Sequence, residues 1–510
     1  MPEMKKPGVY IVEKSAFPGF LMQVPTAVPA FIGYTQQIRR NGESLLLRPV
    51  RVSSYLEFVE IFGSAPVTRF SIEERPERSR EPQAFSFQNR DYLLAPQSMN
   101  FLLHRCMHLF FENGGGACYV VSVGGYDAAI SAHALGKGIE SLEKVREPTI
   151  IVIPETSQLE SAGSYEVQRA ALLHCAETMK NRVAILDLHD GDKPLVDTKD
   201  DCIDRFRSAI GTRGLGYGAA YYPWLNTTVV DAEELNPANI ANPDVLQQLL
   251  RAELQLPEKS DGSESGKMLF MIETVSRLDM AEGVLSDAVA SELGELNKQL
   301  LAISPLYKTI MQSIAERLNL LPPGAAVAGL YAMVDNETGV WKAPANVGLV
   351  DVISPSTLIN DEQQQDLNVS TTGKSINPIR HFPTRGTLVW GARTLDANNP
   401  DWRYINIRRT AIMIEESIRN AIEAIAFEPN DANTWQTIKI LVSNFLSNIW
   451  KEGGLAGSTP DDAFVVNCGL GETMTPQDIL DGVMRVTLMI ALLRPAEFIP
   501  ITIEQQMRTA

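Results

Sequence analysis

The length, composition and charge of the chain indicate a soluble globular protein with more than one domain. Its 510 residues correspond to about three domains at roughly 150 residues each, and 45% of them are hydrophobic. Acidic side chains outnumber basic ones by 62 to 45, which gives a formal net charge of −17. Because so acidic a surface repels phosphate groups, the composition argues against a protein that binds nucleic acid or an anionic membrane surface.

The cysteines and the two chain ends predict folding in a reducing compartment. The five cysteines include no CxxC pair, and the first 15 residues contain no apolar run of the kind found in a secretory signal. Near the other end, the apolar run from Val486 to Leu493 is far shorter than the ~20 residues of a membrane-spanning helix. We therefore expect synthesis in the cytoplasm and no direct membrane insertion.

The first 30 residues are predicted to form an extended N-terminal arm. Val9 to Glu13 are mostly β-branched or aromatic, which favours a strand. Five prolines interrupt the segment, so a helix is excluded and any strand must be short. Ala30 to Tyr34 is then predicted as the first strand of the globular part.

Residues 31–340 show the alternation of strand and helix that is typical of a layered α/β domain. Buried-type strands are predicted at 118–123, 149–154, 183–187 and 218–224. Helix-length segments such as 166–181 lie between them, and this spacing favours a largely parallel sheet. Two polar stretches, near 71–97 and near 232–300, interrupt the alternation and are predicted as exposed insertions.

The last third of the chain is predicted to contain two amphipathic helices and a final edge strand. One helix spans Ala411 to Ala426. In the other, six apolar residues share one face at helical spacing, namely Trp435, Ile438, Val442, Phe445, Leu446 and Ile449. The run from Phe498 to Glu504 is strand-like but contains Pro500, which a sheet tolerates only at an edge or a bulge.

The sequence predicts no cofactor and no metal. It contains no Walker A loop, HExxH or GxSxG motif, and Gly114 to Gly116 follow a helical pattern as a helix end does. His104 and His108 share a helix face, but Cys106 points away from them. Two ligands are too few for a closed metal site.

The strongest catalytic candidate is the loop from Asp187 to Asp192, which follows a predicted strand. Catalytic groups of α/β enzymes lie at this place, but so do the aspartates and glycines that form ordinary turns. An α/β enzyme that uses this loop is therefore the alternative function.

Several blocks of sequence, at both ends and in the last third of the chain, carry a more specific signal than composition. They are PGVYIVE at 7–13 with Phe31-Ile32-Gly33, PPGAAVAGLYAMVDNETGVWKAPANVGLV at 322–350, INPIRHFPTRGTLVWGARTL at 376–395, WRYINIRRTAIMIEESI at 402–418, TWQTIKILVSNFLSNIWKEGGLAGSTPDDAFVVNC at 434–468 and RPAEFIPITIEQQM at 494–507. Together they resemble the tail sheath proteins of contractile phage tails and phage-tail-like injection systems. Residues 40–320 carry little of this signature, and the middle of the chain is longer than a minimal sheath subunit needs.

The resemblance implies an α/β (α+β) multi-domain protein with extended terminal β-arms. A C-terminal sheath core domain at 341–495 is completed by the N-terminal arm at 1–30. A layered α/β outer domain with insertions occupies 31–340, and a C-terminal β-arm occupies 496–510.

The resemblance also implies a structural, non-enzymatic function. Such a subunit stacks as a helical tube around a rigid inner tube and contracts to drive that tube into a target cell envelope. The partners implied are further copies of the chain, the inner tube protein, baseplate and terminal cap proteins, and sheath paralogues. Since no nucleotide site is found, the energy of contraction must be stored at assembly. A capsid-like or tube protein of the same particle is an alternative.

In such a sheath, both arms are implied to pair with sheets of neighbouring subunits, because unpaired sheet edges accept strands readily. The arm residues concerned are Val9, Tyr10, Ile11 and Val12, and Phe498, Ile499, Ile501 and Ile503. The alternative is that each arm folds onto its own subunit. For the inner tube, the predicted contact is the helix near Asn433 to Glu452 or the loop after it, with Lys439 and Lys451 as candidates that fix the register through charge.

Overall fold

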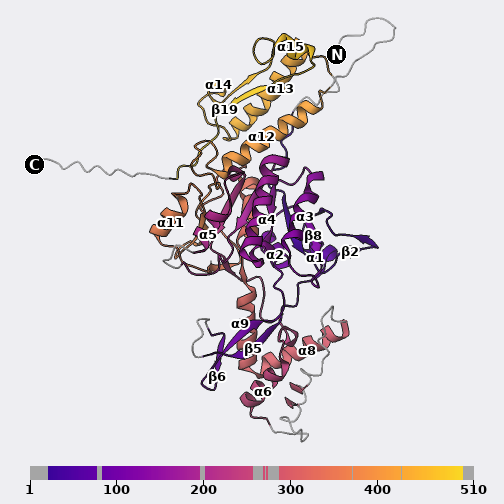
Figure 1. Cartoon of the computed structure of the whole chain (residues 1–510), viewed down its shortest axis with the longest axis vertical. Coiled ribbons are helices and arrows are strands. Elements are labelled where there is room, and N and C mark those ends of the chain that lie inside the picture. The colour runs from indigo at the N-terminus through magenta and orange to yellow at the C-terminus, as the bar shows by residue number, and fades with distance from the viewer. Residues whose placement is uncertain are drawn as a thin grey trace, which may run out of the picture. The chain divides into compact units, whose positions relative to one another are not determined.

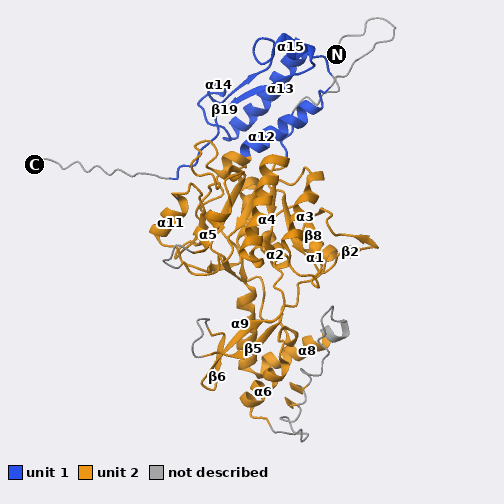
Figure 2. Ribbon diagram, in the orientation of Figure 1, with its two compact units in different colours: residues 1–24, 410–510 blue, residues 25–409 orange. Residues whose placement is uncertain are grey.

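The computed structural model divides the chain into two compact units, which are described one at a time. Unit 2 comprises Pro25–Arg409, and unit 1 comprises residues 1–24 and 410–510 (Figure 2). The structure describes residues 21–76, 83–195, 201–256, 268–269, 272–273, 287–369, 371–426 and 428–497. The predicted arm residues Val9, Tyr10, Ile11, Val12, Phe498, Ile499, Ile501 and Ile503 lie outside them.

Unit 2 is built around a nine-stranded sheet with the strand order β14-β17-β16-β11-β10-β9-β1-β8-β4. The strands are β1 (Pro29–Tyr34), β4 (Val50–Val52), β8 (Cys118–Gly124), β9 (Ile150–Val152), β10 (Val183–Asp187), β11 (Gly218–Tyr222), β14 (Val347–Gly348), β16 (Asn377–Phe382) and β17 (Gly386–Val389). From β8 to β16 all neighbours run parallel, whereas β4, β17 and β14 join antiparallel at the two edges. The predicted strands and the largely parallel α/β sheet are confirmed.

Helices cover both faces of this sheet (Figure 1). Four of them are α2 (Leu103–Glu112), α3 (Ala132–Ser141), α4 (Ser161–Leu173) and α10 (Gly324–Glu337). The ring centroids of Phe31 and of Phe110 on α2 are 4.9 Å apart. The next residue, Ile32, lies instead in the hydrophobic cluster that contains Leu135 and Ile139 of α3. Since successive side chains of a strand point to opposite faces, α2 and α3 lie on opposite sides of β1. All six residues of β1 are buried as a result.

The segment near 71–97 is not the exposed insertion that its charges predicted. It forms the antiparallel sheet β5-β7-β6, with β5 (Phe70–Glu74), β6 (Phe85–Phe87) and β7 (Arg90–Pro96). Ile72, Phe85 and Leu94 are buried in a second hydrophobic core. The prediction was wrong because successive side chains of a strand point to opposite faces, so the charged residues of a half-buried strand occupy only its solvent face.

The second predicted insertion supplies helices to the same second core. Its helices α6 (Pro243–Leu254) and α8 (Asp287–Ile303) gather with α9 (Pro305–Leu318) around Tyr307, which is fully buried (Figure 1). Further strands and α-helices in the described part of unit 2 are β2 (Arg39–Arg40), β3 (Glu43–Ser44), α1 (Tyr55–Phe62), α5 (Cys202–Ala209), β12 (Leu225–Thr227), β13 (Leu320–Leu321), β15 (Val352–Pro355) and α11 (Asp361–Asn368).

Unit 1 combines helices with a two-stranded sheet. Its elements are the larger part of α12 (Ile405–Glu423), then α13 (Ala432–Lys451), α14 (Pro460–Ala463), β18 (Phe464–Asn467), α15 (Pro476–Leu480) and β19 (Thr487–Ile490). The N-terminal segment joins this unit, because the backbone amide of Val24 donates to Ser417 Oγ at 3.0 Å. No helix in the described part of the chain is long and apolar enough to cross a bilayer.

The structure divides the chain between residues 409 and 410, whereas the prediction placed the boundary between 340 and 341. The physical reason is that β14, β16 and β17 extend the large sheet of unit 2 and therefore share its core. At the other end, the division falls between residues 24 and 25 instead of 30 and 31. The assignment of 341–495 as a sheath core domain stays a prediction.

Candidate functional site

Asp187, the first residue of the candidate catalytic loop, has a structural role. Its side chain is buried at the end of β10, and Oδ1 accepts a hydrogen bond of 2.7 Å from the backbone amide of Gly324. The carboxyl group therefore caps the N-terminus of α10, where backbone amides lack partners of their own. Burial raises the pKa of Asp187 to about 7.

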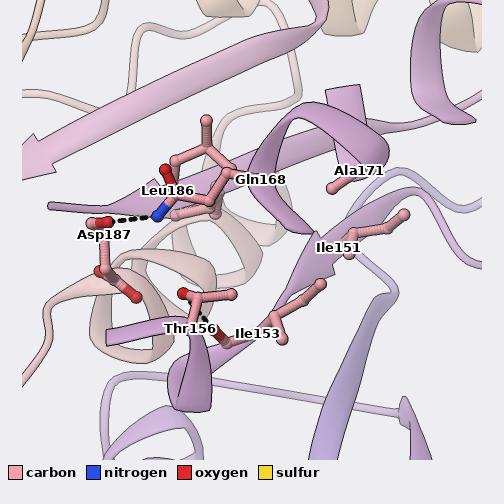
Figure 3. A pocket seen from close by; sticks show the side chains of 8 residues that line it. Ile151, Ile153, Thr156, Gln168, Ala171, Leu186 and Asp187 are labelled. Atoms are coloured by element: carbon pink, nitrogen blue, oxygen red, sulfur yellow. Dashed lines mark hydrogen bonds between the residues drawn. The ribbon is translucent and has the colours of Figure 1, made fainter. Parts of the chain in front are cut away.

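The cavity beside Asp187 is too small for an organic substrate. It is lined by Ile151, Ile153, Thr156, Gln168, Ala171, Ile185, Leu186 and Asp187 (Figure 3). The space open to the centre of a water molecule is about 10 Å³, so the cavity has room for about one water molecule. Gln168 Nε2 donates to the carbonyl oxygen of Asp187 at 2.7 Å, and Gln168 Oε1 has no hydrogen-bond partner among the described residues. The cavity suits a single buried water.

The rest of the loop forms a charged turn. Asp190 bonds Lys193 at 2.8 Å and Arg205 at 3.0 Å, and Arg205 lies on α5. Burial alone would raise the pKa of Asp190, but the hydrogen bonds from Lys193 and Arg205 and the nearby His189 lower it. The ion pairs thus hold the loop against α5. The geometry gives no support to the alternative that this loop is an enzyme active site.

The histidines of α2 lie in an aromatic cluster. His104 and His108 both pack against Tyr55, with ring centroids 5.6 and 4.7 Å away. Burial, together with the smaller effects of the charges of Arg105 and His108, lowers the pKa of His104 to about 4. Burial raises the pKa of the Cys106 thiol well above its usual range. In the parts of the chain that the structure describes, no three His, Cys, Asp or Glu side chains are placed to hold a metal ion.

The two-stranded sheet of β18 and β19 in unit 1 is a candidate assembly site. The strands pair antiparallel, with Val465 opposite Met489, and each has only one strand neighbour among the described residues. Val465 and Met489 are 40% and 57% exposed, so the sheet carries an exposed apolar pair on one face. Beyond β19 the single bridge between Leu455 and Leu492 continues the pairing, and no further strand of the described residues joins the sheet. Such a sheet is suited to receive a strand at an edge.

Helix α13 presents a second candidate surface in unit 1. Its buried face holds Ile438, Val442, Phe445, Leu446 and Ile449, as predicted, whereas Trp435 is only half-buried. The opposite face is the α13 stripe, which we define as the exposed residues Asn433, Thr437, Ile440, Asn444 and Asn448. All five are uncharged. Solvent-facing helix surfaces usually carry charges, whereas the centres of protein interfaces are depleted in them.

The two lysines predicted to contact the inner tube lie on different sides of α13. Twelve residues separate them, which places them about 120° apart around the helix. Lys439 is 27% exposed and bonds Glu472 at 2.7 Å, and this hydrogen bond lowers the pKa of the Glu472 carboxyl. Lys451 is exposed at the end of the α13 stripe. The structure therefore does not bring the two charges together.

Comparison with known proteins gives matches to tail sheath proteins. The family model for the phage tail sheath C-terminal domain matches residues 397–506, and that for the phage tail sheath protein central domain matches residues 296–395. The tail sheath protein of Vibrio phage KVP40 is 26% identical over 175 residues, which are 34% of this chain and 25% of that relative. The chain thus spans about a quarter of the length of this curated relative.

Two solved structures are similar over nearly the whole chain. The baseplate of the anti-feeding prophage (AFP) contains a chain that is 25% identical, with a TM-score of 0.58 and 99% of both chains covered. The PVC sheath complex of an extracellular contractile injection system, in its contracted state, gives 25% identity and a TM-score of 0.58 over 98% of both chains. These matches cover both units.

Proposed function

Because the chain belongs to the family of contractile tail sheath proteins, we propose that it is the structural subunit of a contractile sheath in a phage tail or a phage-tail-like particle. It polymerises helically around an inner tube, and its contraction drives that tube into a target cell envelope. The observation that carries the proposal is the likeness, over 98% of both chains, to a sheath complex in its contracted state. No enzymatic step is part of this function.

Polymerisation follows from strand exchange between subunits. The two-stranded sheet of β18 and β19 supports this step, since each of its strands has one strand neighbour within the described residues and the sheet carries an exposed apolar pair. We assign the incoming strands to Val9–Val12 and to Phe498–Ile503 of neighbouring subunits, segments that lie outside the described residues. A contact of this heterologous kind generates a helical tube when its rotation does not close.

The partners follow from the same role. We assign the inner-tube contact to the α13 stripe together with Lys451, because this face is exposed and uncharged along its centre. Baseplate proteins, terminal cap proteins and sheath paralogues complete the assembly, and the subunit is made in the bacterial cytoplasm before it joins the particle. Residues 341–495 act as the sheath core domain in this proposal.

The energy for contraction is stored in the lattice at assembly. The extended state is then a kinetically trapped state above a more compact lattice. Because many subunits act together, each needs only a small difference in interface energy between two discrete packings. Purified protein without inner tube or baseplate is therefore expected to form tubes of the contracted kind.

Negative-stain electron microscopy of the purified full-length chain tests the function. We expect hollow helical tubes, and discrete globular particles at all concentrations would contradict the proposal. Removing residues 1–20, residues 498–510, or both should leave a folded monomer that forms no tubes. Tubes of normal length from the doubly truncated chain would overturn the strand-exchange step but not the family assignment.

A further inference from the structure

The chain passes between unit 2 and unit 1 at two places, and one buried ion pair lies beside both. The crossings are at residues 24/25 and 409/410. Arg409 and Asp335, both in unit 2, form a bidentate pair with N···O distances of 2.5 and 3.0 Å. Their side chains are only 3% and 4% exposed. A pair buried so deeply is costly to break, because the remaining charge would be left without a partner.

Thr26 connects the first crossing to the same ion pair. Its hydroxyl donates to Asp335 Oδ2 at 2.6 Å, and its carbonyl oxygen accepts from Arg409 Nη2 at 3.2 Å. Asp335 lies on α10 in the core of unit 2. One carboxylate of that helix therefore holds a residue at each of the two places where the chain leaves the unit.

Further buried groups surround this cluster. The guanidinium of Arg409 lies over the ring of Tyr331 at 4.5 Å, and the hydroxyl of Tyr331 shares a hydrogen bond of 2.6 Å with that of Tyr221 on β11. The carbonyl oxygen of Thr26 also accepts from Thr149 Oγ1 at 2.6 Å. The cluster is thus connected to the central sheet through buried groups, where electrostatic interactions are stronger than in water.

The first turn of α12 is anchored in unit 2 by two further side chains. Asn406 Nδ2 donates to the carbonyl oxygen of Trp341 at 2.9 Å. The guanidinium of Arg408 lies 3.5 Å from the ring centroid of Trp402 and 4.3 Å from that of Tyr217. Beyond Arg409 the same helix continues into unit 1. The helix therefore has one end fixed in unit 2.

We propose that Thr26, Asp335 and Arg409 form a clamp that couples the two chain crossings at one point of α10. In the sheath, force that passes between the units along the chain is carried through this point, so the crossings respond together and not as two independent tethers. The mechanical part of this inference rests on the proposed function, whereas the coupling itself is a property of the single subunit.

Hydrogen exchange of the monomer tests the coupling. Thr26→Val removes only the hydroxyl bond to Asp335, since valine has nearly the shape of threonine. We expect amide exchange to become about tenfold faster or more in peptides covering residues 24–28 and also in those covering 405–409, because bonds to charged groups are strong. Faster exchange at 24–28 alone would show two independent tethers and overturn the proposal.

Two further variants complete the design. Asp335→Asn weakens both connections and should give larger increases at the same two segments, and wild-type exchange rates there would contradict the clamp. Glu177→Gln is the matched control, because it breaks a bidentate carboxylate pair with Arg213 whose side chains are 49% and 68% exposed. This control should leave exchange at both segments unchanged.

The length of sheaths after contraction tests the mechanical role of the clamp. Sheaths of the Thr26→Val chain should break into shorter pieces on contraction, whereas the Glu177→Gln sheaths stay intact. Intact Thr26→Val sheaths would overturn the force-bearing role even if the exchange data support the coupling. If the wild-type chain forms no tubes, the proposed function fails, and the exchange experiment still decides whether the clamp exists.

Discussion

Asp187 and Gly324 are joined by a hydrogen bond of 2.7 Å, although 137 residues separate them in the chain. A carboxylate at the end of β10 thereby fixes the start of α10, the helix that carries Asp335 two residues before its end. An added Cβ at Gly324 would lie 2.7 Å from Asp187 Oδ2, so the close approach requires glycine. The loop that resembled a catalytic site is therefore part of the support for the clamp.

Asp187→Asn should remove a pH dependence of stability. Burial raises the pKa of Asp187 from 3.8 to about 7 in the folded state. Between these values only the unfolded chain releases the proton, so this group lowers the stability of the wild type as pH rises from about 4 to about 7. From pH 5 to pH 8, Asp187→Asn should gain about 3 kcal/mol in free energy of unfolding relative to wild type. Urea unfolding at several pH values measures this difference.

The matched control is Asp478→Asn. Hydrogen bonds from the backbone and side chain of Thr475, and from Arg485, lower the pKa of Asp478 to about 2. Asp478 is therefore ionised in both states from pH 5 to pH 8, and its substitution should shift stability by the same amount throughout. A flat difference for Asp187→Asn as well would show that its carboxyl group is ionised in the folded protein.

Two glycines of α3 should respond to alanine with opposite signs. A Cβ at Gly138 would lie 2.4 Å from Ile32 Cγ2 and 2.8 Å from Val123 Cγ1, so Gly138→Ala should cost about 1–3 kcal/mol of stability through overpacking. A Cβ at Gly136 meets no atom within 4 Å, so Gly136→Ala should stabilise the helix by about 0.5–1 kcal/mol. Thermal unfolding of the two variants measures both signs, and a stabilised Gly138→Ala protein would be inconsistent with this packing of α3 on β1.

Ile440→Glu should prevent attachment of the sheath to its inner tube. Ile440 is 52% exposed at the middle of the α13 stripe, so a charge there costs little in the monomer but is unfavourable inside an interface. Co-expression with the inner tube protein and microscopy would show empty sheath tubes. Leu480→Glu makes a similar change at a residue of unit 1 that is 80% exposed, and it should leave tube loading unchanged. Ile440→Glu sheaths that contain the inner tube would show that the α13 stripe is not part of the interface.

The two lysines of α13 should differ in their effect on tube binding. Lys451→Met removes the exposed charge at the end of the α13 stripe and should reduce the fraction of filled sheaths, most clearly at low salt. Lys439→Met removes a charge that is already bonded to Glu472, and it should leave the filled fraction unchanged. The opposite order of effects would place the tube against the other side of the helix.

Local patterns in the sequence were sufficient for the central sheet and for the faces of α13. Runs such as 183–186 are apolar throughout because both faces of a parallel sheet are buried, and this pattern requires no knowledge of the partner strands. The buried positions of α13 from Ile438 to Ile449 follow the helical period in the same way. The family resemblance was carried by blocks of sequence, and residues 296–395 and 397–506 matched it.

The remaining features depend on partners that are distant in sequence. Arg409 meets Asp335 across 74 residues, and Asp335 meets Thr26 across 309, so no local pattern marks the clamp. An aspartate after a strand, such as Asp187, has the same sequence pattern whether it caps a helix or acts in catalysis. The strands between Phe70 and Pro96 were missed because their charged face dominates the composition of the segment.

Unit 1 uses both ends of the polypeptide, and this has a consequence for biosynthesis. At about 5–20 residues per second, Ser417 is translated roughly 20 to 80 s after Val24, its partner 393 residues earlier. The central sheet of unit 2 can therefore be complete on the ribosome before the later part of unit 1 has been translated. A chain becomes competent to join a growing tube only after that later part has emerged and paired with the segment before Pro25.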